Sequence, residues 1–140
     1  MPTPVETSQR ERLTLALILL LILPTVAQAD TGLATWYSVK SAQSEGTSGT
    51  YTASGELYDE SAMTCALRSR NFGQRVKVCH ADTCITVRQN DYGPGRAATK
   101  RGVIVDLSPA AYDALGCKRG VNSKGVAWGE CTITVEPVGG

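Results

Sequence analysis

The chain has 140 residues, with 14 lysines and arginines against 13 aspartates and glutamates, and 42% of its residues are hydrophobic. This length suits one domain with a modest core. The net charge of +1 argues against nucleic acid as the main partner, because no basic cluster stands out to neutralise phosphates.

The N-terminal part of the chain has the pattern of a secretory signal. Two arginines precede the apolar run LTLALILLLILPTVA, which closes on Ala27-Gln28-Ala29, with small residues at the two positions that a signal peptidase reads. A retained membrane anchor is the alternative, but the apolar run before Pro24 has about a dozen residues, whereas a membrane span needs roughly 20. We therefore expect residues 1–29 to be a cleaved signal peptide, with Asp30 as the first residue of a secreted or periplasmic chain that keeps no membrane contact.

Residues 30–140 form one expected domain, in which strand patterns dominate. The strand candidates are 32–38 (GLATWYS), 74–80 (QRVKVCH), 84–89 (CITVRQ), 102–107 (GVIVDL), 125–130 (GVAWGE) and 131–138 (CTITVEPV). The second and third candidates alternate apolar and polar residues, as half-buried strands do, whereas GVIVDL is a continuous β-branched run typical of a strand covered on both sides. The stretch 39–56 is rich in Ser, Thr and Gly and indicates a loop.

One short helix is predicted directly after GVIVDL. Ser108 is a good N-cap, Pro109 suits the first turn, and Gly116 can adopt the left-handed conformation that ends a helix. Short strands joined by Gly-rich turns, with one small helix, favour a mainly β fold in the form of a closed or nearly closed β-barrel.

All five cysteines lie in the part of the chain expected to be exported, where disulfides form and persist. Cys79 and Cys84 bracket HADT between two alternating runs, so a hairpin would bring them close enough to bridge. Cys117 and Cys131 are the next pair, which leaves Cys65 single, although a sequence does not define disulfide connectivity. Because the number is odd, at least one cysteine stays free or pairs with another chain.

A zinc site is the competing interpretation of Cys79, His80 and Cys84. These residues are close in the sequence, and His80 is the only histidine of the chain. No second pair of ligands with the usual spacing follows them, so we expect no metal and no other cofactor.

Two acids stand where apolar, strand-like runs meet turns. Asp91 follows TVRQN and precedes the string YGPG, while Asp106 ends VIV two residues before the helix start. A carboxyl held by rigid turn residues at a barrel rim can face a groove and give a proton to the leaving oxygen of a glycosidic bond. From these residues alone, an Asx-type turn cap is the simpler interpretation of Asp91, and Asp106 can accept backbone N–H bonds at the strand–helix corner.

Several strings together resemble the double-psi β-barrel domain of the RlpA (rare lipoprotein A) family of bacterial septal lytic transglycosylases. The strings GLATWYS, YTASGELYD, AMTCALRSRNFGQRVKV, VRQNDYGPG and RGVIVDLSPAAYDAL occur in the family's order and approximate spacing. The resemblance covers nearly all of residues 32–138, and ASGE, ND-x-GP and V-x-DLS are its most specific elements. It implies a six-stranded double-psi β-barrel, an architecture that expansins share, so the fold alone does not decide the activity.

The resemblance implies that Asp91 is catalytic, because the matching aspartate in RlpA-like domains is implicated in catalysis. It implies a second catalytic role for Glu56, the glutamate of ASGE, which would either tune Asp91 through like-charge repulsion or contact the substrate. The aspartate that matches Asp106 lies near the groove in related barrels, which makes Asp106 a candidate for substrate binding.

Aromatic residues in the same strings are candidates for sugar binding: Trp36, Tyr37, Tyr58 and Tyr92. Their rings offer flat surfaces on which sugar rings stack. Burial in a core is the commoner role of any single aromatic residue, and this alternative stays open.

The chain departs from the family pattern beside the candidate site. Leu67 stands where RlpA-like domains commonly carry a histidine, and His80 lies in the hairpin loop instead. Tyr92 replaces the arginine frequent after ND, and Gly95 replaces the phenylalanine frequent after GP. These changes favour altered specificity or a binding function, whereas the retained acids favour catalysis.

The resemblance implies a peptidoglycan lytic transglycosylase, which cleaves the MurNAc–GlcNAc bond and leaves a 1,6-anhydromuramic end. Most glycoside hydrolases need two carboxylates, but here the sugar's own 6-hydroxyl replaces water, so one carboxyl can donate and then accept the proton. The alternative is a non-catalytic, expansin-like protein that binds and loosens cell-wall polysaccharide, and a secreted inhibitor or effector is a third. The expected partner is the glycan strand of peptidoglycan.

Overall fold

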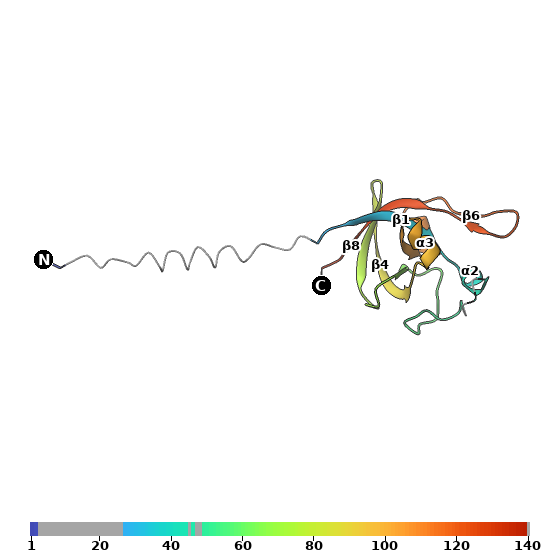
Figure 1. Ribbon diagram of the computed structural model, residues 1–140, viewed down its shortest axis with the longest axis horizontal. Helices are drawn as coiled ribbons and strands as arrows, with labels where there is room; N and C mark the ends of the chain where they lie inside the picture. The colour runs from blue at the N-terminus through green and yellow to red at the C-terminus, as the bar shows by residue number, and fades with distance from the viewer. Residues whose placement is uncertain (3–26, 45, 47–48, 140) are drawn as a thin grey trace.

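The computed structural model of the chain describes residues 1–2, 27–44, 46 and 49–139 (Figure 1). Most of the expected signal peptide, residues 3–26, lies outside the described residues. Among the residues that are described, no helix is long and apolar enough to cross a membrane.

Six strands close into a barrel. Their order around it is β1 (Asp30–Trp36), β5 (Val103–Leu107), β2 (Thr64–Leu67), β4 (Thr83–Tyr92), β3 (Arg75–His80) and β8 (Cys131–Pro137), and β8 returns to β1. The β1–β5 and β2–β4 pairs are parallel, and the other neighbouring pairs are antiparallel. The mainly β, closed six-stranded barrel expected from the sequence is confirmed.

The alternation of apolar and polar residues places one face of each long strand inside the barrel. Val76 and Val78 of β3 are buried while the residues between and beside them are more exposed, as the period-two pattern predicts. In β5 the first, third and fifth residues are buried, but Ile104 and Asp106 are only partly buried. The expectation that β5 is covered on both sides was therefore wrong, because only its inner face is fully enclosed.

Within the described residues, three short helices accompany the barrel. The expected helix is α4 (Pro109–Ala114), whose N-cap Ser108 accepts a hydrogen bond from a backbone amide of the first turn. The sequence does not predict α2 (Val39–Ser44) or α3 (Arg96–Lys100), and α2 lies in the stretch 39–56 interpreted as a loop. Both are too short to show an apolar periodicity. The prediction of a single helix was wrong for that reason.

The strand expected at 125–130 is mostly absent from the described structure. Only β7 (Ala127–Trp128) is extended there, and it pairs with β6 (Gly120–Val121) in a small hairpin that projects beyond the barrel (Figure 1). Gly125 and Gly129 flank β7 with φ values of 77° and 143°, which L side chains rarely adopt, so extended structure stops on both sides. Strand β2, in contrast, is present in the structure but was not predicted from the sequence. Its four residues are too few to show a strand pattern.

One disulfide joins two barrel strands, and a second joins a loop segment to the barrel. Cys79–Cys84 bridges the β3–β4 hairpin, and Cys117–Cys131 joins the segment after α4 to the start of β8. These are the pairs that the sequence favours, and a zinc site at Cys79 and Cys84 does not form while they are bridged. Cys65 is free, and burial raises the pKa of its thiol to about 12, so it stays protonated and unreactive at neutral pH.

Candidate functional site

Asp91 belongs to a row of residues that crosses four strands at one rim of the barrel. The strand register aligns Thr35 of β1, Asp106 of β5, Ala66 of β2 and Asp91 of β4. Neighbouring strands are about 4.8 Å apart, so the backbones of the two aspartates, with β2 between them, are separated by roughly 10 Å. The methyl side chain of Ala66 leaves room between the two carboxylates.

Three hydrogen bonds orient the Asp91 carboxylate. Oδ1 accepts from the backbone amides of Ala53 and Tyr92, both at 2.9 Å, and Oδ2 accepts from the Tyr37 hydroxyl, also at 2.9 Å. The bond from Tyr92 is local, but the donors at Tyr37 and Ala53 lie 54 and 38 positions away in the sequence. Asp91 is therefore held mainly by tertiary contacts rather than by the turn that follows it.

Two stacked tyrosines support Asp91: Tyr37, directly after β1, and Tyr58, in the segment before β2. The ring centroids of Tyr37 and Tyr58 are 4.6 Å apart with an interplanar angle of 9°, and the Tyr58 hydroxyl donates to the Tyr37 carbonyl at 2.9 Å. Burial raises the pKa of Tyr37, and the neighbouring Tyr58 and Asp91 raise it further. Burial also raises the pKa of Tyr58. Both hydroxyls therefore keep their protons at neutral pH and remain donors.

Asp106 faces the same space as Asp91. Its Oδ1 accepts a hydrogen bond from the Thr35 hydroxyl. Its Oδ2 lies 3.1 Å from the position that a Cβ at Gly93 would occupy, so a larger residue there would press on the carboxylate. The N-cap of α4 is Ser108, two residues later. Ser108 is thus the side chain that caps α4, and Asp106 lines the cavities of this rim.

Two adjoining cavities lie along this rim. The smaller, of about 260 Å³, is lined among others by Tyr37, Tyr51, Tyr58, Asp91, Tyr92 and Asp106. The larger, of about 710 Å³, extends toward α3 and the β6–β7 hairpin. Tyr37, Gly95 and Asp106 line both, so we treat them as one rim groove, defined by these two cavities.

Glu56 is not among the residues that line the rim groove. Its carboxylate forms a two-point ion pair with Arg88, with Oε1 2.8 Å from Nη2 and Oε2 3.1 Å from Nη1. The hydrogen bond from Arg88 is the main cause that lowers the pKa of Glu56, so this carboxylate is ionised at neutral pH. The pair ties the turn that contains Ala53 to strand β4.

The aromatic residues singled out from the sequence occupy three different environments. Tyr92 is exposed, lines the smaller cavity and has two arginine guanidinium groups over its ring. Trp36 lines the larger cavity, and the Arg119 guanidinium lies 4.6 Å from its ring. Tyr58 is only 8% exposed, so its main contact is the stack on Tyr37 rather than an open surface for a sugar.

Two exposed aromatic residues of the groove were missed. Tyr51 is 64% exposed and lines the smaller cavity, and Trp128 is 51% exposed and lines the larger one. The signal for Tyr51 is the polar, glycine-containing sequence around it, GTYTAS, which offers no alternating apolar partners to bury a ring. Trp128 lies in the strand candidate 125–130, whose sequence gives no sign that the ring is exposed.

The position that carries a histidine in the resembling family is Leu67, at the end of β2. Its side chain is partly buried and packs against the core, and as a hydrocarbon it has no group for proton transfer. His80 lies at the other end of the β3–β4 hairpin, where it pairs with Thr83. Thr83 and Asp91 are eight residues apart on β4, up to about 26 Å along the strand.

Comparisons with known proteins show the family of the chain. Residues 29–130 match the family model described as lytic transglycolase. A protein of Synechocystis sp., named a probable endolytic peptidoglycan transglycosylase RlpA, is 36% identical over 104 residues, which cover 73% of this chain and 28% of its own. A Nostoc sp. protein of the same name is 39% identical over 87 residues, covering 61% and 21%. The chain thus spans about a quarter of the length of these relatives.

Two solved structures share the fold. The Streptomyces papain inhibitor has a TM-score of 0.52 at 23% identity, over 82% of this chain and 98% of its own. A mutant Clavibacter michiganensis expansin, solved in complex with cellohexaose, has a TM-score of 0.50 at 19% identity, over 80% and 51%. At these identities the likeness shows a common barrel and nothing about activity.

Proposed function

This chain belongs to the lytic transglycolase family, and we propose that it is a peptidoglycan lytic transglycosylase with Asp91 as its catalytic acid. The observation that carries the proposal is the Asp91 carboxylate itself, which lines the rim groove and is oriented by one hydroxyl and two backbone amides. The names of the two cyanobacterial relatives support the same reaction.

The two carboxyl oxygens of Asp91 have different surroundings, and this difference decides which oxygen carries the transferable proton. Oδ1 accepts from two backbone N–H groups, so the transferable proton belongs on Oδ2. The Tyr37 hydroxyl contacts Oδ2 and can donate to it when Asp91 is a carboxylate or accept from it when Asp91 is a carboxyl. The same geometry therefore serves both halves of a proton transfer.

In the proposed reaction Asp91 first gives its proton to the oxygen that links the muramic acid to the next sugar, as that bond breaks. The carboxylate then takes the proton of the muramic acid's 6-hydroxyl, whose oxygen attacks the anomeric carbon and closes the 1,6-anhydro ring. No water is consumed, so no second carboxylate is needed to activate one. Asp106 places negative charge near the sugar while positive charge develops at the anomeric carbon.

Glu56 is a positioning residue in this proposal. Its ion pair with Arg88 anchors the turn whose Ala53 amide binds Asp91. The Ser54 amide of the same turn donates to the carbonyl of Asn90, the residue before Asp91, at 3.1 Å. Glu56 thus acts on Asp91 through the backbone rather than by contact with the sugar.

The exposed aromatic rings are the proposed sugar platforms. Tyr51 and Tyr92 line the smaller cavity, and Trp128 lines the larger one, with Asp106 shared between the two cavities. A glycan strand that stacks on rings in both cavities would pass the carboxylates at its middle. The proposed partner is therefore the glycan of peptidoglycan, bound outside the cytoplasm, where two disulfides are also expected to persist.

The test replaces Asp91 with asparagine. Asp91→Asn keeps the size of the side chain and an oxygen for the backbone amides, but holds no transferable proton, so turnover should fall by roughly 10²–10⁴-fold while glycan binding survives. The exported protein and its variants are incubated with peptidoglycan, with and without stem peptides, and 1,6-anhydromuramic ends are measured by mass spectrometry. Asp82→Asn, in the distant hairpin loop, is the matched control and should act as the parent does.

The outcomes separate the two main function classes. Equal product from Asp91→Asn and the parent would exclude Asp91 as the acid. A parent protein that binds glycan but releases no anhydro ends would favour the non-catalytic, expansin-like alternative, for which Leu67 in place of a histidine is the specific observation.

A further inference from the structure

His80, the only histidine of the chain, has no part in the proposed reaction. It ends strand β3, and its Nδ1 lies 2.8 Å from the carbonyl oxygen of Thr132 on β8. A carbonyl can only accept, so Nδ1 carries the hydrogen of the neutral ring. Nε2 is then the nitrogen with an available lone pair, which is the arrangement of a histidine prepared to bind a metal.

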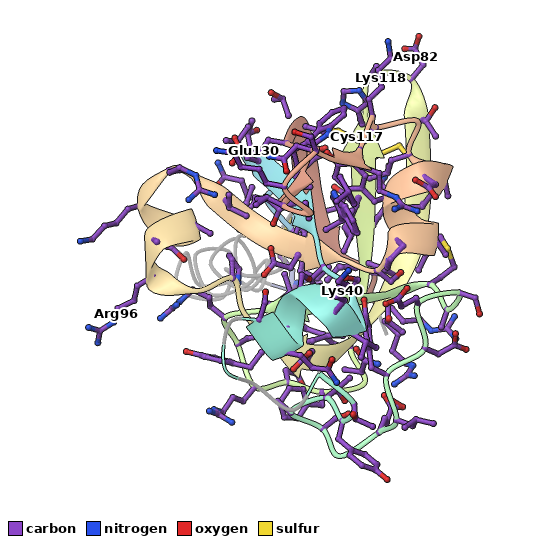
Figure 2. All side chains as sticks on the ribbon, turned by 90° about the vertical axis from the view of Figure 1, so that its right-hand side faces the viewer. Lys40, Asp82, Arg96, Cys117, Lys118 and Glu130 are labelled. Atoms are coloured by element: carbon purple, nitrogen blue, oxygen red, sulfur yellow. A yellow bond between two sulfur atoms is a disulfide. The ribbon has the colours of Figure 1, made fainter. Side chains whose placement is uncertain are left out.

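Two cysteines lie beside this ring. One ring nitrogen of His80 and the Sγ atoms of Cys117 and Cys131 all lie within 4.8 Å of one another. The three residues come from different elements and line a cavity of about 640 Å³. Figure 2 shows Cys117 toward the end of the molecule that carries Asp82, whereas Lys40 of α2 lies farther from Asp82. His80 pairs with Thr83, at the end of β4 far from Asp91, so the cluster lies apart from Asp91. Its cavity adjoins the larger cavity of the rim groove, with which it shares Trp128, Gly129 and Glu130.

We propose that His80, Cys117 and Cys131 bind a zinc-type divalent cation when the Cys117–Cys131 disulfide is reduced. Two thiolates and one imidazole are ligands that zinc prefers, and a fourth position can remain open to water. Ligand atoms about 2.0–2.3 Å from a tetrahedral metal are roughly 3.3–3.8 Å apart, and reduction allows the two sulfurs to separate to that spacing.

The ligand set differs from the one that the sequence suggests. Neighbouring positions point to Cys79, His80 and Cys84, but Cys79 and Cys84 bridge each other across the hairpin. Adjacent residues of a strand face opposite sides, so the His80 ring lies away from that bridge and toward the cysteines of β8 and the segment after α4. The bond from Nδ1 to Thr132 is the outer contact that fixes a metal-binding histidine.

Formation of the site requires a two-electron reductant, such as a dithiol. The Cys117–Cys131 bond takes up two electrons and two protons and becomes two thiols, while the two thiols of a dithiol reductant become a disulfide. The divalent cation then displaces both thiol protons as it binds. The disulfide and the metal complex use the same sulfurs, so they exclude each other.

Cobalt titration tests the proposal. The exported chain carrying Cys79→Ala and Cys84→Ala, which leaves Cys117–Cys131 as the reducible bridge, is titrated with Co²⁺ before and after reduction with a phosphine. The reduced protein should take up one Co²⁺, with thiolate-to-cobalt charge-transfer bands and the visible bands of a tetrahedral ion, and Zn²⁺ should displace it. The oxidised protein should show neither. His80→Ala should weaken binding by roughly tenfold or more, whereas the matched hairpin change Asp82→Ala should not.

Three results would overturn the proposal: no charge-transfer bands after reduction, equal uptake by the oxidised protein, or equal affinity in His80→Ala. Near-UV circular dichroism of oxidised His80→Ala verifies that the variant folds. If reduction alone unfolds the domain, one equivalent of Zn²⁺ should restore the folded spectrum of the parent but not of His80→Ala. A parent that stays unfolded with Zn²⁺ also contradicts the site.

Discussion

Tyr37 shows how a residue that exchanges no proton with the substrate can set up the acid of a site. Its hydroxyl contacts Oδ2 of Asp91 at 2.9 Å, and its ring is fixed by the stack on Tyr58. Because its pKa is raised by burial, the hydroxyl does not compete with Asp91 for ionisation at neutral pH. In the proposed reaction, the role of Tyr37 is therefore to orient the Asp91 carboxyl.

Tyr37→Phe should lower activity while the fold is kept. The phenyl ring can still stack on Tyr58, but the hydrogen bond to Asp91 is lost, and a bond to a charged group contributes about 1.5–3 kcal/mol. We expect the rate of anhydro-end formation to fall roughly ten- to a hundredfold. Tyr112→Phe is the control, because within the described residues the buried Tyr112 hydroxyl has no hydrogen-bond partner. Equal rates for Tyr37→Phe and Tyr112→Phe would contradict the orienting role.

Three of the five tyrosines make the stability of the domain depend on pH in the alkaline range. Burial raises the pKa of Tyr37, Tyr58 and Tyr112 above 10.0, so the folded state keeps protons that the unfolded chain releases near that pH. Their contribution to the free energy of unfolding is complete below the pKa of an unfolded tyrosine, about 10, and is lost as the pH rises above that value.

The melting temperature should accordingly fall as the pH is raised through about 10, and the fall should be shallower in Tyr37→Phe. Tyrosinate absorbance measured beside circular dichroism checks this expectation. Ionisation of all tyrosines with the fold intact would show that burial does not protect the three hydroxyls.

At the scale of elements, the turn around Ala53 and strand β4 build the site together. The ion pair between Glu56 and Arg88 crosses from one to the other, and the Ala53 amide completes the contact at Asp91. Both partners of the ion pair are partly exposed, and such pairs contribute about 0–1 kcal/mol to stability. The pair therefore matters for the position of the turn more than for the stability of the barrel.

Exchanging the charges of Glu56 and Arg88 distinguishes a positioning role of the ion pair from direct participation of Glu56 in catalysis. Glu56→Gln and Arg88→Gln should each lower activity, with melting temperatures close to the parent, because the turn is released. The double variant Glu56→Arg with Arg88→Glu restores an ion pair and should recover activity toward the parent level. Product assays and melting curves of all four proteins measure this. A double variant as inactive as Glu56→Gln would instead indicate contact between Glu56 and the glycan.

At the scale of the whole molecule, barrel closure is what assembles the groove. Strand β1 is parallel to β5 and antiparallel to β8, so the start of the domain is held between its middle and its end. Asp30 pairs with Val135 at the first position of β1. The barrel therefore begins at the residue that the proposed signal cleavage would expose.

Exported protein should begin with Asp30-Thr31-Gly32. Cleavage after Ala29 removes no residue of β1, so the complete strand remains to close the barrel. Intact-mass measurement and N-terminal sequencing of the exported chain test this, and Ala27→Phe with Ala29→Phe should block processing, because a signal peptidase reads small residues there. Mature protein that retains residues 1–29, or that begins inside β1, would contradict the proposed boundary.

Structural features that depend only on residues close together in the sequence could be predicted without a structure. The alternation in β3, the Ser108 cap of α4 and the hairpin partners Cys79 and Cys84 each depend on residues within a few positions of one another. Their geometry follows from the strand period, the first turn of a helix and the pairing across a hairpin. The position of Asp91 at the end of a strand follows from the same local pattern.

The contacts around the candidate sites join residues that are far apart in the sequence, and only the closed barrel brings these residues together. Tyr37 meets Asp91 across 54 positions and Glu56 meets Arg88 across 32, while His80 lies beside cysteines that follow it by 37 and 51. No local pattern encodes these meetings, because they depend on which strands pair and in which register. A shift of one residue would turn each side chain to the other face of its strand. The chain sequence thus supplies the acids and the strands, and the register of six strands decides which groups stand beside them.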